Sequence, residues 1–591
     1  MKQFFKFIFA SMFGVFFAIL LLILVFVGIA SVAVDGGKEV SVKTNSVLHI
    51  KLDYPILDRS PADPFQNFDF QKLSPDKSIG LNEILKNINN AKADDKIKGL
   101  YLDLTSVAAG YATLKEIRNA LVSFGEDSSK FIVAYSEIMS QKAYFLASVA
   151  DEIYLNPQGY MQLMGIGTSI PFFKGMLDKL DVEAQIIRHG KFKSAVEPFI
   201  LEKMSDASKE QTEKFIFSIW DNIVADIASS RGKTVDELNL IADSLLADNA
   251  EEALKLNLVD KLYFKDEVMT ILKEKLNLEE DKKINFVSLA KYGKGKPQPK
   301  EKGKGLIRDR IAVIYAQGGI VMGEGEADEI GSEKISKAIR KARKDDKVKA
   351  IVLRVNSGGG SALASDIILR EMELAKEIKP VIASMGDVAA SGGYYISCMA
   401  DTIVASNVTI TGSIGVLGVL MNAQDFLKNK LGITFDGVKS NPHSDLGDPT
   451  RPLSAFEKKA IQKEIVRIYD VFISHVAAGR GLTEAQVDSI GQGRVWSGAD
   501  ALELGLVDVI GGLDKAIEIA AELAGLEDYK IRELPVRKDP VEQLISQLTG
   551  EAETRLIQYK LGDNYKYYKQ LEMLAKMQGI QAIVPYDLNL N

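Results

Sequence analysis

One serine in this chain is surrounded by small residues, in the segment Met385–Tyr395 (Met-Gly-Asp-Val-Ala-Ala-Ser-Gly-Gly-Tyr-Tyr). Glycine has no Cβ and tolerates tight turns, so the two glycines after Ser391 allow backbone and ligand to approach it closely. An apolar run, Pro380–Ala383, precedes the segment, and Tyr394–Ala400 has helical character. Strand, tight turn and helix expose a nucleophile beside free helix N-terminal amides. The pattern predicts a catalytic serine; a small-residue helix packed on a sheet is the alternative.

A serine hydroxyl is a weak nucleophile until a base takes its proton. The candidate bases are three histidines and one lysine: His189, His443, His475 and Lys193. Lysine serves as a base where burial lowers its pKa toward neutrality. Lys193 lies in Ile186–Phe199, which begins as an apolar strand and stays partly apolar. The residues alone leave three readings open: a Ser-His-Asp triad, a Ser-Lys pair, or Lys191 and Lys193 as solvated charges.

Composition limits the function classes. A chain of 591 residues predicts two to four domains. The net charge of -7 provides no basic surface for nucleic acid, so we expect no nucleic-acid partner. Cys398 is the one cysteine, which excludes an intrachain disulfide. The four histidines, His49 included, show no metal-ligand spacing, so we expect no metal site and no cofactor.

The N-terminal region predicts a membrane anchor. No charged residue occurs from Phe7 to Val34, a run longer than the roughly 20 residues that span a bilayer. Lys2 and Lys6 precede the run and Asp35 follows it. The positive-inside rule then leaves residues 1–6 in the cytoplasm and the body outside. A cleaved signal peptide is the competing interpretation, but its apolar core would exceed the usual length.

Beyond the anchor, the patterns predict an α/β protein. Leu48–Tyr54 alternates apolar and polar residues, as a strand does, and 57–76 is rich in Pro, Asp and Ser, as a loop is. Leu81–Ala93 is an amphipathic helix and Ile97–Leu104 an apolar strand. Helices alternating with strands indicate a largely parallel sheet.

Three blocks of sequence recur in the same order at offsets of 251, 250 and 248: 94–100 with 345–351, 144–151 with 394–401, and 253–260 with 501–508. The chain is therefore predicted to be a tandem duplication of one α/β unit. The predicted first copy covers 35–291, a Gly/Lys/Pro-rich linker 292–305, the second copy 306–540, and a helical segment 541–591.

The two copies differ where the chemistry is expected. Carrying the offset back, Ser391 falls opposite Gln141. The second copy also has a glycine loop, Asn356–Ser361, after the apolar strand Ala350–Val355, whereas the first has Thr105–Gly110 at that place. The second copy is thus predicted to hold the reactive centre.

Three segments, Lys193–Phe199, Met385–Tyr394 and Thr411–Gly415, closely resemble the signal peptide peptidase A family, also called protease IV. The resemblance runs along nearly the whole chain, including the apolar N-terminal run and the duplication. It implies a Clp-protease/crotonase-like ββα-superhelix fold in each copy. It also implies a serine peptidase with a Ser-Lys dyad that cleaves signal peptides left in the membrane after their release from preproteins.

The resemblance assigns roles residue by residue. It makes Ser391 the nucleophile, Lys193 the general base and Ser413 a residue that orients the lysine. It places the oxyanion hole at Gly359 and Gly360 together with the amide of Gly392. Relatives usually have proline before the two glycines; here Gly358 stands there, which makes the unbound loop less preorganised.

The duplication provides a second lysine to consider. Lys439 lies near the position in the second copy that corresponds to Lys193. Short relatives pair serine and lysine from neighbouring subunits, so by resemblance Lys193 of the first copy serves Ser391 of the second. Lys439 is then expected to face the copy that carries Gln141, and neither copy should be active alone.

The resemblance further implies a dome-shaped homotetramer in the bacterial inner (plasma) membrane, single-pass, with the catalytic body on the outer or periplasmic side. Its partners would be signal peptides and other apolar peptides. Three alternatives remain at this point: a broader cell-envelope protease with the same dyad, a catalytically inactive membrane scaffold, and a crotonase-type acyl-CoA enzyme.

Overall fold

The computed structural model describes residues 6–7, 11–18, 20–21, 42–60, 68–69, 74–75, 79–294, 307–536 and 580–584. The predicted anchor, the linker and the C-terminal helical segment therefore lie mostly outside the described residues. Among the helices that are described, none has both the length and the apolar composition needed to cross a bilayer.

The first copy is built on a six-stranded sheet in which every neighbouring pair is parallel. Its strands, in spatial order, are β8 (Lys261–Leu262), β6 (Glu152–Met161), β5 (Phe131–Met139), β4 (Ile97–Asp103), β1 (Ser46–Ile50) and β9 (Asn285–Ser288). The central strands are apolar on both faces, as strands covered on both sides must be.

The second copy repeats this order. Its sheet contains β19 (Val495–Ser497), β17 (Ile410–Gly412), β15 (Val381–Ala390), β13 (Val348–Ser357), β10 (Arg310–Gln317) and β21 (Lys530–Leu534), and β16 (Thr402–Ala405) joins β15 to β20 (Val509–Ile510). The segment Glu152–Met161 of β6 corresponds to β16 and β17 together. The equivalent order of strands agrees with the predicted duplication.

A third, mixed sheet joins the two copies to the end of the chain. Its order is β12 (Glu329–Gly331), β11 (Gly319–Val321), β14 (Gly359–Ser361), β22 (Ile580–Ile583), β18 (Leu417–Asn422) and β7 (Glu183–Arg188). Strand β7 comes from the first copy, and β22 lies beyond both copies. A separate two-stranded sheet contains β2 (Phe68–Asp69) and β3 (Ser74–Pro75).

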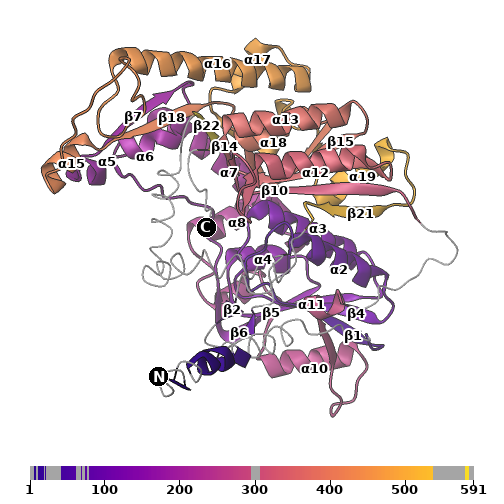
Figure 1. Ribbon diagram of the computed structural model, residues 1–591. Helices are drawn as coiled ribbons and strands as arrows, with labels where there is room; N and C mark the ends of the chain where they lie inside the picture. Colours follow the sequence, from indigo (N-terminus) through magenta and orange to yellow (C-terminus); the bar gives the residue numbers. More distant parts are fainter. Residues whose placement is uncertain are drawn as a thin grey trace.

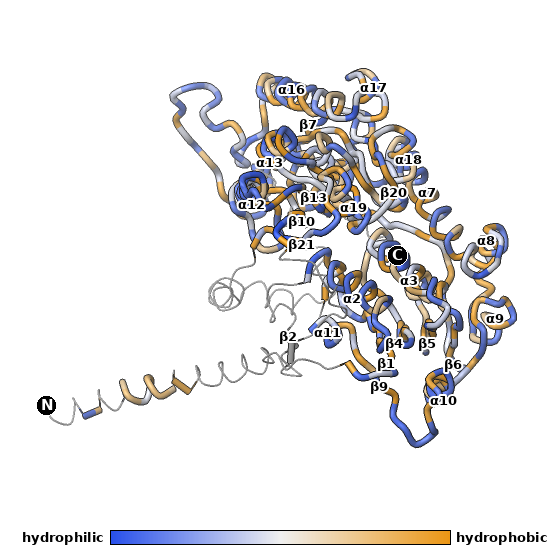
Figure 2. Tube along the Cα trace, turned by 90° about the vertical axis from the view of Figure 1, so that its right-hand side faces the viewer, coloured by the Kyte–Doolittle hydropathy of each residue, from blue (hydrophilic) through white to orange (hydrophobic). Residues whose placement is uncertain are grey.

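Helices cover the sheets of both copies (Figure 1). In the first copy they are α2 (Leu81–Ala93), α3 (Tyr111–Gly125), α4 (Gln141–Ala147), α5 (Lys174–Lys179), the 3₁₀ turn η1 (Ser194–Val196), α6 (Glu197–Ile200), α7 (Asp206–Arg231), α8 (Val235–Asp243), α9 (Ala250–Lys255), α10 (Lys265–Lys275) and α11 (Leu289–Tyr292). In the second they are α12 (Ser332–Lys344), α13 (Ala362–Lys376), α14 (Gly392–Tyr395), α15 (Gln424–Leu431), α16 (Ala455–Arg480), α17 (Glu484–Ile490), α18 (Gly498–Glu503) and α19 (Leu513–Leu523). Figure 2 shows the outer helix α12 as largely hydrophilic.

The longest helices, α7 and α16, correspond to each other and have the same start and stop signals. Ser205 and Ser454 each accept a backbone N–H from the first turn, which satisfies one of the free amides at a helix start. Gly232 and Gly481 end them in the left-handed conformation, at φ of 62° and 65°. Helix α7 crosses from the first copy onto the second, because its residues share a core with Ile410 and Val495.

A buried ion cluster fastens the two copies together. Arg354 in β13 donates to the Asp58 carboxylate at 2.7 Å and to the Glu116 carboxylate at 2.6 Å, and all three side chains are buried. Glu116 in α3 also accepts the backbone N–H of Leu513 at 2.7 Å. Removing one member would leave an uncompensated buried charge, so this seam holds only as a complete set.

Several sequence predictions need adjustment. The predicted helix over 81–93 has the observed bounds, and β4 ends one residue short of the predicted Leu104. The predicted strand over 48–54 is β1, which ends at Ile50, where its register with β4 also ends. The helix expected over 394–400 is a single turn, α14. The Asp401 carboxylate accepts the Val381 N–H at 2.8 Å, which returns the chain to the sheet before a longer helix forms.

Candidate active site

Ser391 lies where β15 ends and α14 begins, as the strand–turn–helix pattern predicted. Its φ of 56° and ψ of −114° are unusual for a residue with a side chain, and such backbone strain concentrates at functional sites. The Ser391 N–H donates to the Gly412 carbonyl at 2.8 Å, which fixes the turn against β17. The side chain is buried, so its hydroxyl is held in one place.

Lys193 reaches this hydroxyl from the first copy. Its Nζ lies 2.8 Å from Ser391 Oγ, 3.1 Å from Ser413 Oγ and 3.2 Å from the Ser413 carbonyl oxygen. The lysine is 0% exposed, and burial lowers its pKa well below the ordinary 10.5. No carboxylate opposes that shift. A neutral amine beside a serine hydroxyl is a base poised to accept its proton.

The loop before β19 encloses the lysine. The Phe192 N–H donates to the Gln492 carbonyl at 3.0 Å. Gly493 has a φ of 84°, and a Cβ placed there would lie 2.7 Å from the Lys193 backbone and side chain. A Cβ on Gly415 would lie 3.3 Å from Lys193 Cδ. The absence of side chains at both glycines makes the tight enclosure, and hence the burial, of Lys193 possible.

Gln211 in α7 was not singled out in the sequence, yet it holds the lysine segment in place. Its Nε2 donates to the Phe192 carbonyl at 3.0 Å and to Ser194 Oγ at 2.7 Å. Its Oε1 accepts the Val495 N–H at 3.2 Å. The amide is buried and joins both sides of the seam between the copies. A polar residue within a long helix carries no sequence signal of such a role.

Ser413 also has a positive φ, 51°, and its N–H donates to the Arg494 carbonyl at 2.6 Å. The next loop position is tied down as well, because the Gly493 N–H donates to the Ile414 carbonyl at 2.6 Å. Ser413 therefore offers both its hydroxyl and its carbonyl to Lys193 from a fixed turn. The structure brings Ser391, Lys193 and Ser413 together.

The glycine loop lies directly beside this cluster. Gly359 and Gly360 have φ of 99° and 156°, and a Cβ on Gly392 would lie 3.0 Å from Gly359 Cα. The Gly359 N–H donates to Ser357 Oγ at 3.1 Å, and that hydroxyl donates to the Gly318 carbonyl at 2.7 Å. Backbone amides gathered next to a nucleophile are the arrangement that stabilises a developing oxyanion.

Asp387, four residues before the serine, links its strand to the first copy. Its carboxylate accepts the Thr113 N–H at 2.9 Å and the Thr113 hydroxyl at 2.6 Å, at the start of α3. Burial raises the pKa of this carboxyl. The serine strand and the first copy are therefore fixed to each other close to the reactive turn.

In the first copy the corresponding position is closed by Gln141. Its Nε2 donates to Tyr111 Oη at 2.9 Å and to the Gly165 carbonyl at 3.0 Å. Its Oε1 accepts the N–H groups of Met164 and Gly165 at 2.9 and 3.0 Å. The glutamine thus fills a site equivalent to that of Ser391 with a satisfied structural network.

The other candidate bases lie elsewhere. His189 packs on the Tyr469 ring, His443 pairs with Glu457 at 3.0 Å, and His475 lies 3.6 Å from the Asp366 carboxylate. In the described residues no hydrogen bond joins a histidine to Ser391. The expectation that Lys439 faces Gln141 is wrong: its Nζ pairs with the Asp445 carboxylate at 2.5 Å on an exposed loop.

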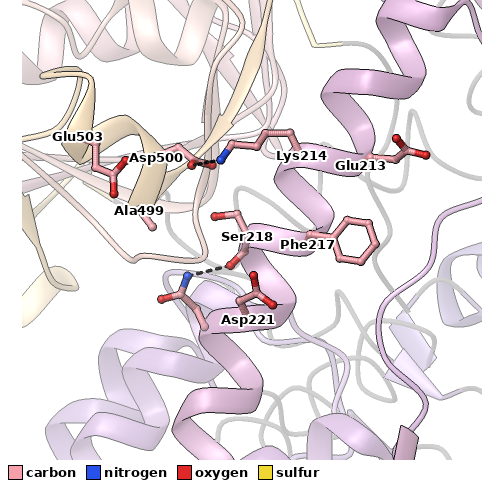
Figure 3. A pocket seen from close by; sticks show the side chains of 9 residues that line it. Glu213, Lys214, Phe217, Ser218, Asp221, Ala499, Asp500 and Glu503 are labelled. Carbon is pink, nitrogen blue, oxygen red and sulfur yellow. Dashed lines mark hydrogen bonds and ion pairs between the residues drawn. The ribbon is translucent and has the colours of Figure 1, made fainter. Parts of the chain in front are cut away.

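A separate hollow of about 530 Å³ opens at the seam between α7 and α18 (Figure 3). Its rim carries Glu213, Asp221, Asp500 and Glu503, and Lys214 pairs with Asp500 at 3.0 Å across it. None of the residues around Ser391 lines this hollow.

Comparison with known proteins identifies the family. Two regions, 125–279 and 373–527, match peptidase family S49. Over 485 residues the chain is 38% identical to Protease 4 of Salmonella typhi, an alignment that covers 80% of this chain and 77% of that protein. The chain belongs to peptidase family S49. The second matched region begins 248 residues after the first (125 to 373), so the predicted duplication is confirmed as two S49 domains.

Other family S49 relatives align over most of the chain. Protease 4 of Haemophilus influenzae is 33% identical over 96% of this chain and 95% of its own length. Serine protease SPPA, chloroplastic, of Arabidopsis thaliana is 35% identical over 85% of this chain and 74% of its own. The chain is therefore a serine peptidase, and the resemblance to the protease IV family is confirmed. A solved ClpP1 structure from Listeria monocytogenes covers 35% of this chain and 94% of its own at 16% identity and a TM-score of 0.24, too low for any argument.

Proposed function

We propose that this peptidase is a membrane-anchored endopeptidase that uses Ser391 as nucleophile and Lys193 as general base. The observation that carries the proposal is the 2.8 Å approach of a fully buried Lys193 Nζ to Ser391 Oγ. The lowered pKa provides the neutral amine that this role requires. The intact pair argues against an inactive scaffold.

The reaction follows from the positions of these groups. Lys193 takes the Ser391 proton as the hydroxyl oxygen attacks the carbonyl carbon of the peptide bond. The amides of Gly359 and Gly392 stabilise the negative oxygen, and each such donor is typically worth about 3–4 kcal/mol. Protonated Lys193 then gives its proton to the leaving amine. In the second half, Lys193 takes a proton from the water that hydrolyses the acyl-enzyme.

Ser413 has a positioning role in this proposal. Its hydroxyl and carbonyl hold the Lys193 Nζ in line with the serine, so the lysine spends little entropy in finding the reactive geometry. Gly360 supports the hole indirectly, by keeping the loop in a conformation that a side chain would disfavour.

The substrates we propose are cleaved signal peptides and other apolar peptides at the membrane. Support comes from the apolar run over 7–34, which would tether the site where such peptides concentrate. The full proposal has a single-pass inner-membrane protein, its body on the periplasmic side, assembled as a homotetramer of ββα-superhelix domains. A broader envelope protease is the second candidate, because the same dyad serves either substrate class.

Hydrolysis of a synthetic signal peptide by the purified full chain tests the proposal. We expect activity in the natural protein and none with Ser391→Ala or Lys193→Ala. An unfolded soluble protein, offered at the same concentration, decides between the two substrate classes. Equal cleavage of both would favour the broader protease, and full activity of Ser391→Ala would refute the mechanism.

A further inference from the structure

A short strand from the end of the chain occupies the groove beside the reactive serine. Strand β22 lies between β14, the glycine-loop strand, and β18, and it is antiparallel to both. Among the described strands it alone joins β14 to β18. An extended peptide that adds to two open strand edges is a common way for a protein to bind a peptide.

The register places one peptide bond at the reactive centre. Ala582 pairs with Gly360, and the Val584 N–H donates to the Gly358 carbonyl at 2.8 Å. A Cβ on Gly359 would overlap the Ala582 carbonyl oxygen, and one on Gly392 would lie 3.1 Å from that same oxygen. The Ala582 carbonyl therefore lies between the two amides that we assign to the oxyanion hole.

The side chains of the strand are packed as those of a bound peptide are. Ala582 is fully buried within the second copy's core, where a larger side chain would collide. Ile583 contacts an apolar cluster that includes Val196, near the lysine, and Leu417 in β18. The two flanking positions thus prefer a small residue before the bond and an aliphatic residue after it.

We propose that the peptidase cleaves its own chain between Ala582 and Ile583. This inference rests on the proposed Ser391–Lys193 mechanism and extends it to a specific substrate. Ser391 Oγ attacks the Ala582 carbonyl carbon, and the Ala582–Ile583 bond breaks as Lys193 protonates the Ile583 nitrogen. Residues 583–591 leave as a peptide. Water then hydrolyses the ester, which regenerates Ser391 and leaves a chain that ends in the Ala582 carboxylate.

The intact mass of the purified full chain provides the test, with Ser391→Ala as the uncleaved reference. We expect the natural protein to lose the mass of residues 583–591 and the variant to keep it. A synthetic signal peptide is offered in parallel. If the natural protein hydrolyses that peptide while its own end stays intact, the inference is overturned and the proposed function stands. If neither is cleaved, the proposed function itself fails.

Substitution at one position separates register from simple accessibility. Ala582→Gly keeps a small residue and should still be cut after position 582. Ala582→Trp should slow this cleavage by about 100-fold or more, because the buried site cannot take the added volume. Cleavage of Ala582→Trp at the natural rate, or at another bond, would refute the register.

A dilution series distinguishes cleavage within one chain from cleavage between chains. The strand belongs to the same chain as the groove, so the fraction cut per hour should be independent of protein concentration over a 100-fold range. A matched mixture then adds natural protein to the Ser391→Ala variant, whose own end should stay uncut. Rapid trimming of the variant in that mixture would overturn the intramolecular assignment.

Discussion

Replacing Lys193 by Met tests the central physical claim, that this lysine is neutral because it is buried. Methionine keeps a similar apolar volume and carries no proton. The comparison is best made in the Ser391→Ala background, where no self-proteolysis disturbs the unfolding measurement. Lys191→Met is the matched control, because Lys191 is exposed two positions earlier in the same segment.

The expected size follows from proton linkage. Between the lowered pKa of folded Lys193 and the unfolded value of 10.5, the unfolded chain holds one more proton than the folded chain. The free energy of unfolding of the lysine form therefore rises with pH, by about 1.4 kcal/mol per pH unit, and levels off above 10.5. The methionine form lacks this dependence. Its stability advantage should be largest at low pH and should shrink at that rate toward pH 10.5.

Urea unfolding at pH 7, 8, 9 and 10, followed by the fluorescence of Trp220 and Trp496, measures this difference. Both tryptophans belong to elements at the seam, α7 and β19. Other groups titrate alike in both variants and cancel. A stability difference that stays flat with pH, or equals that of Lys191→Met, would refute a buried neutral lysine. In the active protein, kcat/KM should fall as pH drops through the same lowered pKa.

Three further variants have distinct expected outcomes. Lys439→Ala should keep natural kcat/KM on a signal peptide, since that lysine pairs with Asp445 far along the exposed loop; loss of activity would reinstate it as a base. Ser413→Ala should lower kcat by roughly 10- to 100-fold with little change in KM, because it frees the lysine without removing it; an unchanged kcat would exclude the positioning role. Arg354→Met should destabilise the chain by about 3–5 kcal/mol in the urea assay, since it leaves the Asp58 and Glu116 carboxylates buried without their cation; a change below about 1 kcal/mol would contradict that account.

Local sequence determined the reactive turn and the duplication. Small residues around Ser391 permit one tight turn between a strand and a helix, and that constraint is written within a dozen positions. The repeated blocks preserve the same order of strands in both sheets, because hydrophobic periodicity acts over single elements. The resemblance added the identity of the lysine, which periodicity could not provide.

Tertiary structure decided which lysine can be neutral and what fills the groove. Lys193 and Lys439 look alike as sequence, but only Lys193 is enclosed, by Gly415 and Gly493 from the other copy. Its hydroxyl partner lies 198 residues away, and burial over such separations is not encoded in any local pattern. The same reason hid the roles of Gln211 and of β22. A pKa depends on the solvent that surrounding atoms exclude, and those atoms gather only when the chain folds.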